Sequence, residues 1–150
     1  MQTRKSARLI IVDSTARLLL FRYHDEHQAA FWATPGGELK TGESYRDAAS
    51  RELYEETGLE AEIGPLLKER DEVYAVARSG PDRWLEKYYL VSCPEHAEVF
   101  AAKWTEEEQS TIQEWKWWGV DELLGSNPSS FKPEWLPRLL ESVIKKRQVP

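Results

Sequence analysis

The sequence lacks the features that mark exported, membrane-spanning or nucleic-acid-binding proteins. It has one cysteine, Cys93, which cannot form an internal disulfide and fits a reducing cytoplasm. No apolar run approaches the roughly 20 residues that a membrane-spanning helix needs. With 26 acidic and 20 basic side chains the formal net charge is −6, and a negative surface repels the phosphate backbone of nucleic acids. We therefore expect a cytoplasmic protein that binds neither membranes nor long nucleic acid.

Internal repeats, linkers and low-complexity tracts are also missing, and 150 residues is a common size for one globular domain. We expect a single domain over residues 1–150. Branched and aromatic runs predict strands at residues 8–12, 17–23, 31–34, 61–63, 67–76, 84–93 and 114–118, with turns at residues 13–15 and 79–82. Apolar spacing predicts helices at residues 43–57, 120–124 and 133–147, and residues 105–108 form a loop or a helical turn. This order of elements predicts a mixed sheet with helices packed on its faces.

The helix predicted over residues 43–57 carries an unusual set of charges. Because each helical residue advances about 100°, Glu52, Glu55 and Glu56 share one face. Like charges at this spacing destabilise a helix by a few tenths of a kcal/mol per pair, a cost that a divalent cation reverses. Oxygen ligands favour Mg²⁺ or Mn²⁺ over zinc. A merely solvated acidic face is the alternative, but Gly36 and Gly37 before the helix would let backbone carbonyls approach a cation.

The same region carries a resemblance to a known family. Gly37 is followed after five residues by Glu43, and after seven more by Arg51-Glu52-Leu53-Tyr54-Glu55-Glu56-Thr57-Gly58-Leu59. This spacing resembles the Nudix box at each of its defining positions. Residues 32–37 and 114–123 are similar to family segments before and after the box, so most of the chain is covered. The resemblance implies an α/β fold, a Nudix-type α/β/α sandwich around a mixed β-sheet.

The resemblance also implies roles for the box residues. Glu52, Glu55 and Glu56 match the glutamates that bind Mg²⁺ (or Mn²⁺), and the Gly37 carbonyl is a further candidate ligand. Glu52 or Glu55 would lie nearest the activated water. Arg51 matches a position that pairs with the first box glutamate, at residue 43, and holds the helix and loop in register, so we count it with the catalytic group.

Outside the box the assignments are more open. Many family members place a further catalytic glutamate on a later loop, and Glu107, Glu108 and Glu114 compete for that role. We count Glu108 as catalytic and Glu114 as substrate-binding. The candidates for stacking on a base are Trp32, Tyr74, Trp84 and Trp117. Gly36 is a further substrate-binding candidate, and Tyr74, 16 residues after Gly58, lies about where dinucleoside polyphosphate hydrolases carry a tyrosine.

These observations predict a divalent-metal-dependent pyrophosphohydrolase that cleaves a phosphoanhydride bond in a nucleoside diphosphate linked to another group. The resemblance implies nucleoside triphosphates, dinucleoside polyphosphates, ADP-ribose or nucleotide sugars as substrates, so the expected partner is a nucleotide-type small molecule. Whether the protein forms a homodimer is left open by the sequence. One alternative is a catalytically inactive nucleotide sensor, which would be expected to have lost box glutamates. Isoprenoid diphosphate isomerase chemistry is another, but Cys93 lies in an apolar run and lacks the context of a reactive thiol.

Overall fold

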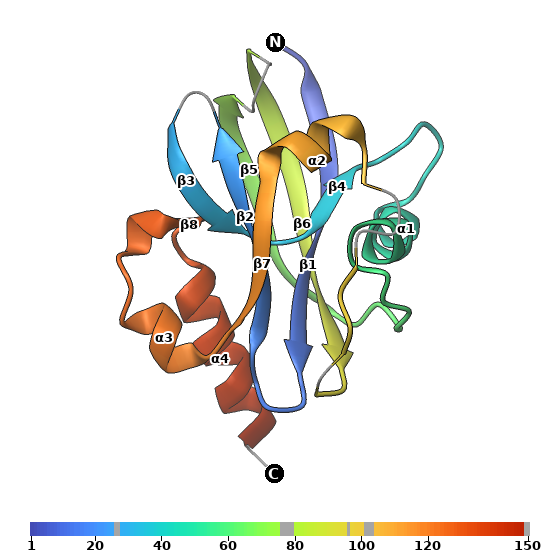
Figure 1. The fold of residues 1–150 in the computed structure, drawn as a ribbon. Coiled ribbons are helices and arrows are strands. Elements are labelled where there is room, and N and C mark those ends of the chain that lie inside the picture. The colour runs from blue at the N-terminus through green and yellow to red at the C-terminus, as the bar shows by residue number, and fades with distance from the viewer. Residues whose placement is uncertain (26–27, 76–79, 96, 101–103, 149–150) are drawn as a thin grey trace.

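The computed structural model describes residues 1–25, 28–75, 80–95, 97–100 and 104–148 of the chain. The strands are β1 (Thr3–Asp13), β2 (Leu18–Asp25), β3 (Gln28–Ala33), β4 (Gly36–Glu38), β5 (Leu66–Ala75), β6 (Pro81–Cys93), β7 (Ile112–Trp118) and β8 (Phe131–Lys132). The helices are α1 (Tyr45–Thr57), α2 (Glu106–Thr111), α3 (Val120–Leu124) and α4 (Leu136–Gln148), with a 3₁₀ turn, η1, at Pro128–Ser130 (Figure 1).

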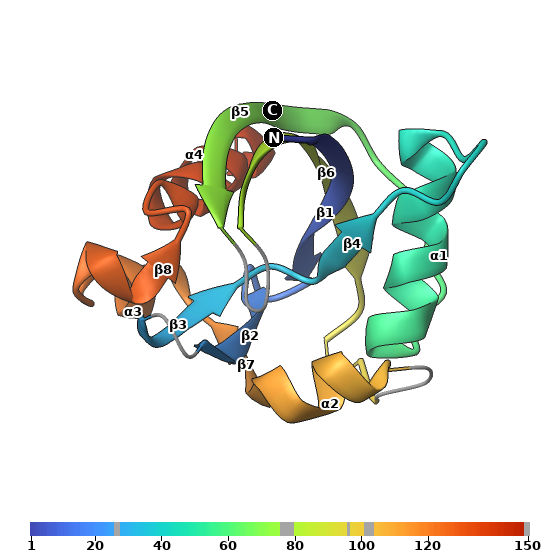
Figure 2. The same ribbon diagram turned by 90° about the horizontal axis from the view of Figure 1, so that it is seen from above.

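The strands form one mixed sheet in the order β5-β6-β1-β2-β3-β8, and β4 and β7 add to β1 and β2. Strand β1 is the centre of this arrangement. One edge of β1 pairs in parallel with β6 along its whole length, from Thr3 to Asp13. Its other edge pairs with β4 through Ser6–Arg8 and with β2 at Val12. The sheet curls, so that β5, β6 and β1 lie across from β3, β2 and β7 in the view from above (Figure 2).

Alternating side chains of β1 divide the core in two. Ala7, Leu9 and Ile11 pack with α1, whereas Ile10 and Val12 pack with α3 and α4. Because both faces of the central strand are apolar, helices cover both sides of the sheet. This arrangement confirms the predicted α/β/α sandwich around a mixed β-sheet. No helix in the described part of the chain has the length and hydrophobicity that crossing a membrane requires.

Helix α1 begins and ends where its capping residues require. The Ser44 side chain accepts a hydrogen bond from the Asp47 backbone N–H at 3.1 Å, which satisfies a donor of the first turn. Gly58 has the left-handed φ of 72° and donates its N–H to the Tyr54 carbonyl. Leu53 is buried against the sheet and fixes which face of α1 points inward. These contacts hold the acidic face of α1 beside β4.

Four sequence predictions of local structure need correction. Residues 61–63 form no strand. The backbone hydrogen bonds to β6 come instead from the next two residues, because Gly64 donates its N–H to the Leu90 carbonyl and Pro65 accepts from the Leu90 N–H. Pro65 has no N–H with which to extend this pairing. Residues 36–38, where paired glycines favour a loop, are instead a short strand, β4, because they pair with β1. Pro81 and Asp82 belong to β6 and not to a turn, and α4 begins at Leu136, three residues later than predicted. Residues 76 and 79 of the predicted strand and turn lie outside the described residues.

Candidate metal centre

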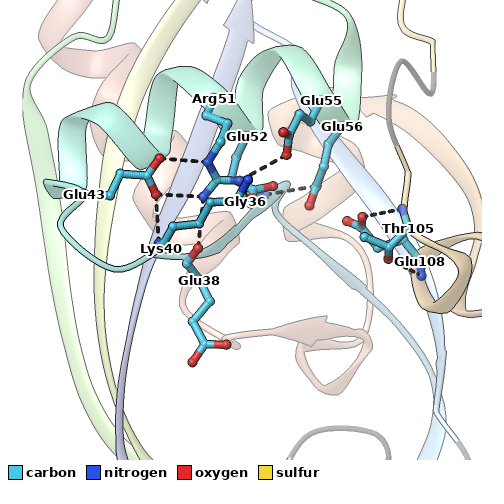
Figure 3. Close-up of polar contacts among 10 residues, drawn as sticks. All are labelled: Gly36, Glu38, Lys40, Glu43, Arg51, Glu52, Glu55, Glu56, Thr105 and Glu108. Carbon is cyan, nitrogen blue, oxygen red and sulfur yellow. Dashed lines mark hydrogen bonds and ion pairs between the residues drawn. The ribbon is translucent and has the colours of Figure 1, made fainter.

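Three carboxylates from two helices meet at one point. Glu52 and Glu56 come from α1 and Glu108 from α2, and one oxygen of each lies within 4.8 Å of the others. The side chains approach one another across the gap between the helices (Figure 3). Glu56 is 2% exposed and Glu52 is 8% exposed. Glu108 is half-buried, and a set of carboxylate oxygens at this spacing fits a hard divalent cation such as Mg²⁺.

The electrostatics of the cluster support the same conclusion. Burial raises the pKa of Glu56 well above its usual value, and hydrogen bonding with Glu108 and the charge of Glu52 raise this pKa further. Burial also raises the pKa of Glu52, although hydrogen bonding to Arg51 opposes the rise. A proton or a cation between such closely spaced buried carboxylates relieves their repulsion. The donor set therefore fits a divalent cation.

Arg51 organises the acidic face of α1. Its Nη1 donates to Glu52 Oε1 at 2.7 Å and to Glu55 Oε2 at 3.0 Å. Its Nε and Nη2 donate to the two carboxylate oxygens of Glu43 at 2.8 and 2.9 Å, and Nη2 also reaches the Glu38 carbonyl (Figure 3). The hydrogen bonds from Arg51 lower the pKa of Glu43 to about 2. The expected pair of Arg51 and Glu43 is thus present and ties the helix to the loop before it.

The two glycines before α1 allow close packing at the centre. Gly36 has a φ of 140°, and a Cβ there would lie 2.8 Å from the Arg8 Cα. Its N–H donates to Glu56 Oε2 at 3.1 Å. A Cβ at Gly37 would lie 2.6 Å from the Glu52 Cδ. Glycine is therefore needed at Gly36, where backbone atoms of β1 leave no room for a side chain, whereas at Gly37 it leaves room for the Glu52 carboxylate.

The structure brings together only some of the glutamates that the sequence singles out. Glu55 is held by Arg51 and lies outside the cluster of three, whose third member is Glu108. Glu114 lies on β7 and pairs with Arg22 at 3.7 Å, with more than half of its side chain exposed. The side chain of Glu107 lies outside the described part of the chain. The Thr105-x-x-Glu108 spacing is a capping-box signal that predicts the start of α2, but not a metal ligand.

Three of the four aromatic residues predicted to stack on a base, Trp32, Tyr74 and Trp84, already contact other aromatic rings. Tyr74 stacks on Trp84, with ring centroids 5.5 Å apart and an interplanar angle of 16°. Trp32 contacts Trp118 edge to face at 5.2 Å, and Trp117 packs against the core under α1. The Trp84 indole Nε1 is buried and has no hydrogen-bond partner among the described residues.

A buried polar network lies on β1, β5 and β6, and sequence reasoning missed it. Its centre is Glu86, which is 3% exposed. The Glu86 carboxylate accepts hydrogen bonds from Ser6 Oγ at 2.9 Å, Arg70 Nη1 at 3.1 Å and the Tyr74 hydroxyl at 2.8 Å. Arg8 Nε lies 3.8 Å from it. The available signal was polar residues at inward positions of two paired strands, where Ser6 lies opposite Glu86.

Comparisons with known proteins place this geometry in a family. The model of the NUDIX domain matches residues 2–139. An RNA pyrophosphohydrolase of Wolbachia pipientis wMel is 30% identical over 128 residues, which is 77% of this chain and 76% of the relative. An RNA pyrophosphohydrolase of Novosphingobium aromaticivorans is 36% identical over 64 residues, 43% of this chain and 40% of the relative, so that match spans less than half of the relative. The MutT protein of Methanosarcina mazei Go1 shares the fold, with a TM-score of 0.71, 19% identity, and coverage of 98% of this chain and 96% of that chain.

Proposed function

The chain belongs to the Nudix family, whose domain model matches residues 2–139, and we propose that it is a divalent-metal-dependent pyrophosphohydrolase acting on nucleoside diphosphates linked to another group. The observation that carries this proposal is the cluster of Glu52, Glu56 and Glu108, of which Glu52 and Glu56 are buried. The relatives named RNA pyrophosphohydrolase support hydrolysis of a phosphoanhydride bond as the reaction class.

The residues of the centre would divide the work between binding and proton transfer. Glu52, Glu56 and Glu108 would hold Mg²⁺ or Mn²⁺, with the carbonyl of Gly37 as a further candidate ligand. A bound cation would neutralise diphosphate oxygens and make a water molecule more acidic. Burial of Glu52 and Glu56 keeps bulk water from weakening these interactions.

The proton acceptor is a carboxylate on the acidic face of α1 or on α2. Glu52, Glu55 and Glu108 are the three groups for this role. Arg51 binds both Glu52 and Glu55 through Nη1, so it fixes the direction in which each carboxylate points. We therefore assign Arg51 to positioning, because its contacts are with the glutamates and the loop. A missing general base lowers turnover by about 10²- to 10⁴-fold.

The substrate is a nucleotide-type small molecule. Nucleoside triphosphates, dinucleoside polyphosphates, ADP-ribose and nucleotide sugars form the test panel, and the name RNA pyrophosphohydrolase of the relatives adds RNA to it. Gly36, Trp32, Tyr74 and Glu114 stay proposed contacts of the substrate. The exposed ion pair of Glu114 with Arg22 leaves both side chains free to rearrange around a ligand.

A nucleotide panel with Mg²⁺ or Mn²⁺, followed by separation of the products, tests this proposal. We expect metal-dependent release of a nucleoside monophosphate or of a phosphate product from at least one substrate. Glu56→Gln should abolish most of the turnover, and Glu106→Gln, an exposed residue of α2, serves as the matched control. Measurable nucleotide binding without hydrolysis of any panel member would favour the inactive sensor.

A further inference from the structure

We propose that Arg8 binds a phosphate oxygen of the substrate beside the metal centre, and that buried Glu86 is the positioning residue that holds the Arg8 side chain in place. This inference rests on the proposed function and names a substrate contact that the Nudix box does not contain. Arg8 lies on β1, opposite Gly36 of β4, so its backbone borders the loop that leads into α1.

Arg8 lies between the Glu86 network and the metal centre. Its Nε is 3.8 Å from Glu86 Oε2. Its pairing partner on β4, Gly36, donates its N–H to Glu56 Oε2 at 3.1 Å, which places the Arg8 backbone close to the metal centre, and the Arg8 side chain also interacts with Tyr23. Its Nη2 donates to the Thr34 carbonyl at 2.7 Å, which directs the group toward the end of β3. Arg8 therefore bridges the metal centre and the Glu86 network.

Arg8 has more hydrogen-bond donors than its described neighbours accept. A guanidinium carries five N–H donors in one plane. Among the described residues, the Thr34 carbonyl and the Tyr23 hydroxyl are its hydrogen-bonding neighbours, and Glu86 lies at ion-pair distance. The Thr34 hydroxyl beside it is buried and has no hydrogen-bond partner in the described part of the chain. Both groups can contact an oxygen-rich ligand.

The charges of the network also favour an anion. Two arginines, Arg8 and Arg70, share the single buried carboxylate of Glu86. The other carboxylate partner of Arg70 is Glu72, which is half exposed. Arg8 is part-buried, with its side chain 19% exposed, and the one carboxylate beside it is shared with Arg70. A phosphate oxygen would supply a second anionic partner.

The chemistry of the donor set selects phosphate among the groups of a nucleotide. A guanidinium binds two oxygens of a phosphate through parallel N–H bonds, and such charge-assisted bonds are about twice as strong as neutral ones. A base or a sugar has no charge to match. Because Arg8 adjoins the metal centre, its phosphate would be one of the diphosphate group or the phosphate next to it.

Glu86 would act on the substrate only through Arg8. Its carboxylate lies 3.8 Å from Arg8 Nε. Hydrogen bonds from Ser6, Arg70 and Tyr74 fix the position of Glu86 itself. Glu86→Gln keeps the shape of the side chain and removes the charge that attracts Arg8. It also leaves one acceptor oxygen in place of two, because Ser6 and Tyr74 donate to different oxygens of Glu86. This variant should therefore show a weaker form of the Arg8 defect.

Binding of one nucleotide and of the matching nucleoside without phosphate tests the proposal in the full chain. Calorimetric titrations with Ca²⁺ present would compare wild type with Arg8→Gln, Arg8→Lys, Glu86→Gln and the control Arg83→Gln, whose exposed side chain pairs with Asp71. We expect Arg8→Gln to weaken nucleotide binding about tenfold or more, with nucleoside binding within about twofold of wild type. Arg8→Lys should restore part of the loss, Glu86→Gln should fall between, and Arg83→Gln should match wild type.

A role in folding alone would affect both ligands, because a disordered site loses contacts to base and phosphate together. Equal weakening of nucleotide and nucleoside, or nucleotide binding by Arg8→Gln and Arg8→Lys within twofold of wild type, would overturn the proposal. If Arg8→Gln does not fold, Arg8→Lys carries the same comparison, because it keeps the charge and loses only the two-pronged contact. A wild type that binds nucleotides through Arg8 but hydrolyses none would instead refute the proposed reaction, so the two failures are distinguishable.

Discussion

Gly37 lies so close to Glu52 that a Cβ atom on Gly37 would be 2.6 Å from the Glu52 Cδ. The two residues belong to β4 and α1, so this contact sets how near the loop approaches the metal centre. The colliding atoms are the end of a flexible side chain, and they can move at little cost to the fold. A substitution at Gly37 can therefore disturb the metal centre while leaving the stability of the fold nearly unchanged.

Gly37→Ala should displace the Glu52 carboxylate and lower turnover by about 10²-fold, because misplacement by about 1 Å near a reacting centre costs that much. The melting temperature should change by only a few degrees. Gly80→Ala is the matched control, since a Cβ on Gly80 meets nothing within 4 Å. Kinetics and thermal unfolding of both variants check the prediction. Wild-type turnover in Gly37→Ala would show that the position of Glu52 does not matter.

Substitutions of single glutamates should distinguish ligands from neighbours. Glu56→Gln and Glu108→Gln each remove a charge from the cluster, so turnover should fall by about 10²- to 10⁴-fold. Metal affinity in these two variants should fall as well. Glu55→Gln removes a hydrogen-bond acceptor of Arg51, and we expect its metal affinity to stay closer to that of wild type. Manganese titrations measure each affinity. A greater loss of affinity in Glu55→Gln than in Glu108→Gln would reverse this assignment.

Removal of divalent cations should abolish activity and leave the fold intact. The core is built from apolar side chains on both faces of β1, and no part of it depends on the metal. A chelator should therefore leave the circular dichroism spectrum unchanged, and added Mn²⁺ should raise the melting temperature by relieving the repulsion within the cluster. Unfolding on chelation would mean that the cation is structural.

Asp13 predicts a pH dependence of stability far from the metal centre. Burial alone would raise the pKa of Asp13, but hydrogen bonds from Arg17 and Thr15 lower it below the usual value. A lowered pKa in the folded state means that Asp13 stabilises the fold at pH values above its usual pKa of about 3.9. This contribution disappears as the pH falls through the lower, folded pKa.

Asp13→Asn should therefore lower the free energy of unfolding at pH 7 by about 1 to 3 kcal/mol. The difference from wild type should shrink as the pH falls below about 4. Urea unfolding at a series of pH values measures it. A difference that stays constant down to pH 2 would rule out a charge effect and leave only a change of packing.

The sequence predicts the part of the site that lies on one continuous segment. Helix α1 follows from its apolar spacing and from Gly58, and its charges place Glu52 and Glu56 on one face because helical geometry is regular. The same periodicity put Glu55 on that face, but which of the three reaches the cluster depends on where Glu108 of α2 lies. Arg51 binds both Glu52 and Glu55, and a pattern of spacing carries no information about the position of α2.

The spacing of residues along the sequence could not predict contacts between distant segments. Glu108 joins the cluster because α2 packs near α1, although 52 residues separate it from Glu56. Likewise, Ser6 and Glu86 meet because β1 and β6 pair in parallel over their whole length, a register that neither strand encodes alone. Polar residues at inward positions of the two strands could indicate a buried polar network, but only once the pairing of β1 with β6 was known.

The most direct test of the account is anomalous diffraction from crystals of the protein grown with Mn²⁺. We predict a peak in contact with Glu52, Glu56 and Glu108 together, with Glu55 still bound to Arg51. The same crystals of Glu56→Gln should lose most of the peak. A manganese ion bound elsewhere in a catalytically active protein, with these three carboxylates outside its coordination, would contradict the account.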